Sequence, residues 1–187
     1  MQYEVLDISG DAGIKAYGKT CEEAFANAGM GMYSLITDIG NINERQEIGI
    51  EVKSDSIEGL LVSFLNELIF RFDTYGFIGN RIEVMSLKFG VTNKTISKAP
   101  SPSPSPAGGE GNNIAPPLRG GDKGEGDLCG FTYEVLSMSY ELKAKIYGEE
   151  FDIDRHERRL LVKAATYHNI RVEKTGDKWE VEVIFDI

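Results

Sequence analysis

The last eleven residues of the sequence read Asp177-Lys178-Trp179-Glu180-Val181-Glu182-Val183-Ile184-Phe185-Asp186-Ile187. Apolar and charged side chains alternate along most of this stretch, and a period of two is typical of a β-strand with one buried face. The alternation continues to Ile187, so we expect the sequence to end inside a β-sheet rather than in a frayed tip. We place the rest of the chain around this strand.

Two anionic groups meet at the end of this strand. The Asp186 carboxylate and the Ile187 terminal carboxylate are one residue apart, and such a pair repels itself unless a cation or a donor compensates it. Two interpretations stay open at this point. One is an edge strand with a solvated carboxylate. The other is a site for a hard cation such as calcium or magnesium, which needs further carboxylates from elsewhere in the chain.

The composition limits the class of protein. The chain has 187 residues, enough for one domain with a substantial core, and a formal net charge of −10. This charge argues against a direct grip on nucleic acid, which needs clustered Lys and Arg, and it suits a basic or metal-bearing partner. No apolar run reaches membrane-spanning length, and the first residues do not resemble a signal peptide, so we expect a cytoplasmic protein without a membrane segment.

Two helices are predicted, and each begins with a capping pattern. Thr20-Cys21-Glu22-Glu23 is a capping box that opens a helix to about Thr37. Asp55-Ser56-Ile57-Glu58 opens the second helix, whose apolar stripe continues to Phe72 and makes it the main core element. The strands that we expect cover residues 3–7, 14–18, 46–53, 77–90, 131–148, 160–166, 170–174 and 178–187.

Residues 92–130 differ in composition from the rest of the chain. They contain all six prolines and eight of the 21 glycines. Such a segment cannot bury enough apolar surface to order itself. We therefore predict a single domain over 1–187, with a disordered Pro/Gly/Ser-rich insertion in the hairpin between the strands at 77–90 and 131–148.

Three polar positions can serve either structure or chemistry. Asp7 and Asp11 lie in a predicted turn-rich loop, residues 7–13, where aspartate often bonds its own backbone, although both carboxylates are also presented for binding. Lys163 interrupts an apolar run from Leu160 to Ala165. A lysine there is usually an outward-facing strand residue, and it can also be a catalytic or phosphate-facing cation.

Taken together, the motifs and their order resemble the archease family across nearly the whole chain outside the insertion. The matching segments are Tyr3–Asp7, Gly10–Ile14, Ala16–Gly18, Thr20–Ala28, Leu35–Asp38, Leu65–Leu68, Tyr147–Glu149, Val162–His168 and Phe185–Ile187. The resemblance implies an α+β domain with two helices packed against a largely antiparallel sheet.

The resemblance also implies a function. Archeases are accessory proteins that activate an RtcB-type RNA ligase in tRNA splicing, where they promote ligase guanylylation and multiple turnover without being enzymes themselves. They bind a divalent cation, typically calcium. The ligands implied for this chain are Asp11, Asp186 and the Ile187 terminal carboxylate, and Lys163 is the implied contact with the ligase site or its nucleotide.

One departure and two rival functions accompany this hypothesis. The family usually has His-Thr-Ala-Asp where this chain has Ile8-Ser9-Gly10-Asp11, and isoleucine can neither donate a hydrogen bond nor bind a metal. A calcium-dependent hydrolase using Asp11 and Asp186 is one rival, but the two histidines, His156 and His168, show no spacing typical of a nucleophile–base pair. A generic chaperone-like binding module is the other.

Overall fold

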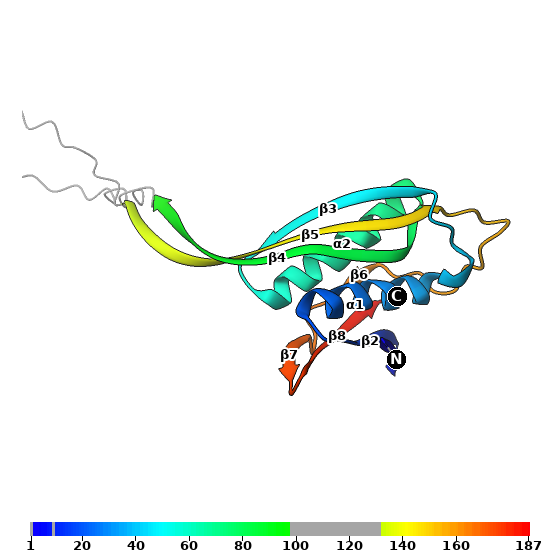
Figure 1. The fold of residues 1–187 in the computed structure, drawn as a ribbon, viewed down its shortest axis with the longest axis horizontal. Coiled ribbons are helices and arrows are strands. Elements are labelled where there is room, and N and C mark those ends of the chain that lie inside the picture. Colours follow the sequence, from blue (N-terminus) through cyan, green and yellow to red (C-terminus); the bar gives the residue numbers. More distant parts are fainter. Residues whose placement is uncertain (1, 9, 98–131) are drawn as a thin grey trace, which may run out of the picture. The chain divides into compact units, whose positions relative to one another are not determined.

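The computed structural model of the protein describes residues 2–8, 10–97 and 132–187. One compact unit comprises Met1–Thr92 and Ser137–Ile187, and a second comprises Asn93–Leu136. In chain order the elements are β1 (Tyr3–Ile8), β2 (Asp11–Gly18), α1 (Cys21–Ile36), the short 3-10 helix η1 (Ile39–Asn41), β3 (Gln46–Ser54), α2 (Ile57–Tyr75), β4 (Phe77–Ser97), β5 (Thr132–Glu150), β6 (Ala164–Ala165), β7 (Arg171–Thr175) and β8 (Lys178–Asp186) (Figure 1).

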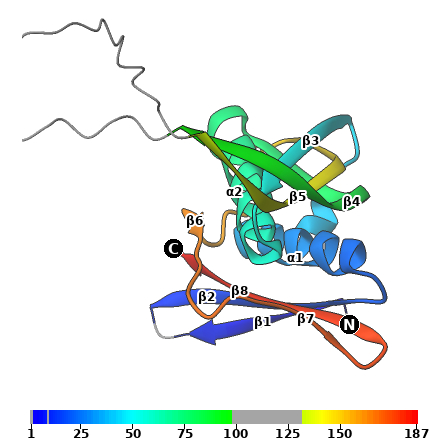
Figure 2. The same ribbon diagram turned by 90° about the vertical axis from the view of Figure 1, so that its left-hand side faces the viewer.

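The strands of the first unit form two sheets. The first has the order β1-β2-β8-β6, with β7 also pairing with β8, and these pairs are antiparallel. The second has the order β3-β5-β4. Figure 2 shows the two helices as a layer between the sheets. The predicted α+β class, with two helices packed on antiparallel sheet, is therefore confirmed.

The terminal strand β8 is central rather than marginal. It pairs with β2 along one edge and with β6 and β7 along the other. The interpretation of this stretch as an edge strand is therefore wrong. One neighbour, β7, directly precedes β8 in the sequence, but the other, β2, lies near the start of the chain, and alternation within β8 cannot reveal such a partner.

Both helices begin where their caps predict. The Thr20 hydroxyl accepts a bond from the Glu23 N–H at 3.2 Å, and the Glu23 carboxylate accepts from the Lys19 N–H at 2.7 Å, one residue before the cap. In α2 the Ser56 hydroxyl accepts from the Gly59 N–H at 3.0 Å. These bonds satisfy amides that have no partner within a helix.

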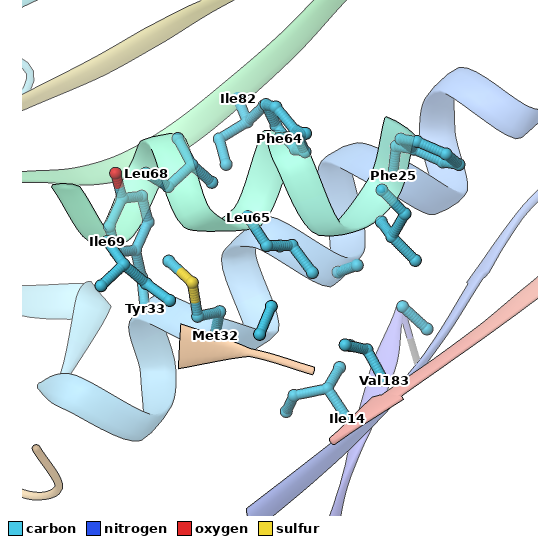
Figure 3. Close-up of a cluster of buried hydrophobic side chains, with 14 of the residues drawn as sticks. Ile14, Phe25, Met32, Tyr33, Phe64, Leu65, Leu68, Ile69, Ile82 and Val183 are labelled. Atoms are coloured by element: carbon cyan, nitrogen blue, oxygen red, sulfur yellow. The ribbon is translucent and has the colours of Figure 1, made fainter. Parts of the chain in front are cut away.

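The core lies between the helical layer and the two sheets (Figure 3). Phe25 and Met32 of α1, Phe64 and Leu65 of α2, and Val183 of β8 are completely buried. Each such side chain contributes about 1.5–3 kcal/mol relative to an exposed one. Helix α1 packs against β2 and β8, and α2 packs against α1, β3 and β6, so the opposite face of β8 has no helical cover.

Close packing requires one glycine of α1. A Cβ atom at Gly31 would lie 2.8 Å from Cγ2 of Ile14 on β2 and 3.2 Å from the ring of Tyr3 on β1. Because a methyl group does not fit there, glycine at this position lets α1 approach the first sheet directly.

The predicted loop over residues 7–13 is wrong. β1 continues to Ile8 and β2 begins at Asp11, so Asp7 and Asp11 belong to strands. Gly10 has a φ of 87°, a left-handed conformation that suits a tight hairpin turn. Ser9 lies outside the described residues.

The predicted strand over residues 160–166 is mostly wrong, since only Ala164–Ala165 is a strand. The preceding residues follow the end of α1 instead. The Arg159 N–H donates to the Ile36 carbonyl at 2.9 Å, and the Leu160 N–H donates to the Leu35 carbonyl at 3.0 Å. These amides satisfy carbonyls that the helix end leaves free, which competes with strand pairing.

The predicted pairing of the strands that flank the insertion is confirmed, since β4 and β5 are neighbours in the second sheet. β4 reaches Ser97, beyond the predicted end at Gly90. The remainder of the predicted insertion, residues 98–130, lies outside the described residues. Among those that are described, no helix is long and apolar enough to cross a lipid bilayer.

Candidate functional site

The first sheet brings Asp11 and Asp186 together. The register of β2 and β8 pairs Ala12 with Phe185, and the next step along both strands places Asp11 opposite Asp186. Residues directly opposite in an antiparallel pair project from the same face, with Cβ atoms about 4.5–5.5 Å apart. Two predicted ligands, 175 positions apart in the sequence, therefore share one end and one face of the sheet.

That face is the one turned away from the helices. Ala12 and Phe185 are buried in the core, and their neighbours Asp11 and Asp186 alternate with them onto the opposite face. Asp186 is exposed and Asp11 is half-buried. A ligand or a partner protein can therefore reach both carboxylates from solvent.

Lys163 joins the same strand end. Its backbone N–H donates to the Asp186 carbonyl at 2.8 Å, which continues the pairing of β6 with β8. Its Nζ donates to the main-chain oxygen of Ile187, also at 2.8 Å. The ammonium group thus places one positive charge beside a strand end that carries two aspartates.

This end offers oxygen donors of the kind that calcium prefers. Asp11 and Asp186 supply two carboxylates, and Ile187 supplies a main-chain oxygen beside them. The described residues contain no group of three or more His, Cys, Asp or Glu side chains suited to a metal ion. Calcium takes six to eight oxygen ligands, so a cation held here would take most of its ligands from water or from a partner.

An apolar wall flanks the two carboxylates. The register places Ile8 opposite Asp11, and Leu6 and Ile184 on either side of Gly13. A Cβ atom at Gly13 would lie 3.0 Å from Cδ1 of Ile8 and 3.1 Å from Cβ of Leu6, so both side chains cover this glycine. Ile8 therefore packs beside Asp11, at the position where the family usually has histidine.

Two other aspartates, Asp7 and Asp38, lie outside the candidate site. Asp7 pairs with Ala12 in the register of β1 and β2, so its side chain projects from the opposite face to that of Asp11. Asp38 caps η1, since its carboxylate accepts from the Gly40 N–H at 3.1 Å and from Nδ2 of Asn41 at 3.2 Å. Neither joins the candidate site.

Neither histidine lies at the candidate site. His156 is buried, and its Nδ1 accepts from the Asp152 N–H at 3.0 Å. His168 is exposed, with its ring 3.1 Å from Nδ2 of Asn169. Within the described residues neither forms a metal-binding group with Asp11 and Asp186.

Sequence reasoning missed a buried carboxylate, Glu149. It accepts from Arg155 at 2.6 Å, from the Asn43 N–H at 2.8 Å and from Nδ2 of Asn43 at 3.1 Å, and it lies 3.2 Å from Nε of Arg45 and 3.3 Å from Nε2 of His156. Burial raises its pKa, but the bonds from Arg155 and Asn43 outweigh this effect and lower the pKa to about 2. Glu149 thus links Asn43 and Arg45 before β3 to Arg155 in the turn that follows β5.

Fold and strand end together define a class: a small α+β protein with a helical layer between two sheets and an open, oxygen-rich end on one of them. The model of the archease protein family matches residues 3–101 and 128–187, and the chain belongs to this family. The resemblance inferred from the motifs is thereby confirmed.

Individual relatives agree with this assignment. The chain is 28% identical to the protein archease of Pyrococcus furiosus over 187 residues, which covers 100% of this chain and 99% of that one. It is 29% identical to the protein archease of Methanosarcina barkeri over 186 residues, covering 100% and 96%. The solution structure of protein 1598 of Methanobacterium thermoautotrophicum is similar, with a TM-score of 0.60, 25% identity and coverage of 100% and 99%.

Proposed function

We propose that this protein is a non-enzymatic activator of an RtcB-type RNA ligase and that it acts in tRNA splicing in the cytoplasm through the open end of β8. One observation carries the proposal: the register of β2 and β8 brings Asp11 and Asp186 to the same strand end, where Lys163 contacts the Ile187 oxygen. Membership of the archease family supports the same assignment.

The first part of the proposal is a divalent cation, calcium, held by Asp11, Asp186 and the Ile187 terminal carboxylate. Two carboxylates on one solvent-facing sheet end repel each other by about 1 kcal/mol at 4 Å in water and by more near a protein surface. A cation relieves this repulsion. The Lys163 ammonium donates to the Ile187 oxygen. When the cation binds this oxygen, we expect the ammonium either to move away or to keep its bond beside the cation.

The second part concerns the ligase. Open coordination positions let the bound cation meet groups of a partner, which an enclosed site would prevent. We propose that this end docks at the active site of the ligase and organises metal or nucleotide during guanylylation, with Lys163 contacting the site or its nucleotide. The ligase then supplies the catalytic groups. The archease chain supplies the charge of the cation and of Lys163 and positions the metal or nucleotide.

Multiple-turnover RNA ligation tests the proposal. The cognate ligase is assayed alone, with the intact chain, with Asp186→Ala and with Asp177→Ala. Asp177 is the matched control, because it is an exposed aspartate of the turn before β8, at the other end of that strand. We expect stimulation by the intact chain and by Asp177→Ala and none by Asp186→Ala. Equal stimulation by both variants would contradict the proposal.

A further inference from the structure

The short strand β6 has a second partner besides β8. It lies between β8 and helix α2 (Figure 2). On the side of α2, Oδ1 of Asn66 accepts from the Ala165 N–H at 2.8 Å, and Nδ2 of Asn66 donates to the Ala165 carbonyl at 3.4 Å. The amide of one helical side chain therefore takes the place that a neighbouring strand would have.

The backbone of Ala165 needs both bonds. Ala165 is only 5% exposed, and a buried N–H or carbonyl without a partner destabilises a fold. A side chain that bonds both groups must carry a donor and an acceptor, and the amide of Asn or Gln supplies them on separate nitrogen and oxygen atoms. The residue type at position 66 thus suits the backbone N–H and carbonyl of Ala165.

The same strand carries the candidate site. Lys163 directly precedes β6, and its N–H bonds the Asp186 carbonyl. Directly after β6, the N–H and the hydroxyl of Thr166 both bond the Ile184 carbonyl, at 2.9 and 3.1 Å. β6 is therefore held by β8 on one edge and by Asn66 on the other, and the Lys163 side chain extends from this clamped segment.

We propose that Asn66 is a positioning residue for the cation and ligase site. It fixes β6 in register with β8, so that the Lys163 ammonium meets the Ile187 oxygen and the Asp186 backbone keeps its place beside Asp11. The inference rests on the proposed function for the role of that site. The clamp itself rests on the bonds between Asn66 and Ala165.

The chain supplies a matched control for a merely structural role. Asn27 of α1 also bonds a strand backbone, with Nδ2 donating to the Tyr17 carbonyl at 2.6 Å. Tyr17 lies near the end of β2 opposite to Asp11. Asn→Asp at either position removes the donor and keeps the shape, so the two substitutions break the same kind of bond at opposite ends of one sheet.

The experiment compares the full chain with Asn66→Asp and Asn27→Asp at a single pH. Calorimetry with calcium alone gives the affinity. NMR gives the ¹⁵N signal of the Lys163 ammonium and the hydrogen exchange of the Thr166 amide, which bonds the Ile184 carbonyl of β8. Asn66→Asp keeps an acceptor for the Ala165 N–H but loses the donor to the Ala165 carbonyl. For this variant we expect loss of the Lys163 signal, faster Thr166 exchange and about 10- to 100-fold weaker calcium binding, as for other residues that orient metal ligands. For Asn27→Asp all three should stay within about twofold of the intact chain.

The inference is overturned if Asn66→Asp keeps the Lys163 signal and the calcium affinity, or if both variants weaken calcium binding equally. If Asn66→Asp does not fold, Asn66→Gln keeps the amide, displaced by one methylene, and the same measurements should show an intermediate loss. If the intact chain binds no calcium, the proposed cation fails, and the Lys163 and Thr166 signals still decide whether Asn66 positions β6.

Discussion

Two carboxylate groupings of this protein have opposite surroundings. Glu149 is buried and receives bonds from Arg155 and Asn43. Asp11 and Asp186 face each other in reach of solvent, and no hydrogen bond or ion pair of their side chains occurs among the described residues. A carboxylate that its own protein satisfies stabilises the fold, whereas a pair that it leaves unsatisfied can bind an external cation. The difference separates a structural carboxylate from the pair that we propose as the cation site.

The largest expected effect on stability comes from the satisfied carboxylate. Glu149→Ala leaves Arg155 and His156 without their anionic partner, and removing one partner of a buried hydrogen-bond network costs about 1–3 kcal/mol. Urea denaturation measures this loss. Asp186→Ala is the comparison and should change the free energy of unfolding by less than about 0.5 kcal/mol in the absence of calcium. Similar losses for both variants would erase the contrast between the two groupings.

Calcium should reverse that order. A ligand that binds only the folded state stabilises it by about 2.7 kcal/mol at 100 times its Kd. We expect this gain in the intact chain and in Glu149→Ala, and no gain in Asp186→Asn, which keeps the shape but lacks the charge. Thermal unfolding with and without calcium gives the answer, with magnesium as the comparison ion. A calcium gain that survives in Asp186→Asn would place the cation elsewhere.

Acid should affect the satisfied carboxylate specifically. The pKa of Glu149 falls from an ordinary 4.5 to about 2 on folding. A group whose pKa is lower in the folded state stabilises it above the unfolded pKa, so its contribution is present above about pH 4.5 and is lost as the pH falls towards 2. Unfolding free energies of the intact chain should decline across this window, and those of Glu149→Gln should decline less steeply. Parallel curves would show that Glu149 contributes nothing to the decline.

The smallest expected effect concerns the apolar wall. Ile8→His restores the residue that the family usually has and places a hydrogen-bond donor opposite Asp11. Because Ile8 is only half-buried, the substitution should cost less than about 1 kcal/mol of stability. We expect ligase stimulation to rise by a few-fold in a multiple-turnover assay. Leu6→His, on the same face two residues away, is the control and should give no rise.

Local patterns in the sequence predicted where helices and strands lie better than they predicted which elements pack together. Alternation identified β8, and the caps at Thr20 and Ser56 located both helices to within a residue at their starts. These signals are local, since a cap or a strand period depends on a few consecutive residues. The central position of β8 and the short length of β6, which has only two residues, depend on partners far away in the sequence. Consecutive residues do not encode such partners.

The candidate site divides in the same way. Asp11, Asp186 and Lys163 were assigned from the family motifs, and the register brings them to one strand end. Glu149 was missed as a charge centre because its partners Asn43 and Arg155 lie 106 positions before it and six after it, with no periodic spacing. Burial is what makes this carboxylate unusual, and burial follows from the fold rather than from the sequence around it.

The most direct test of the central claim is the formation of the ligase–guanylate intermediate. The RtcB-type ligase is mixed with labelled GTP and with the intact chain or with the double variant Asp11→Asn and Asp186→Asn, and the guanylylated ligase is followed over time. The account predicts faster formation with the intact chain and no acceleration with the double variant, while both proteins remain folded. Acceleration by the double variant equal to that of the intact chain would contradict the claim that this strand end activates the ligase.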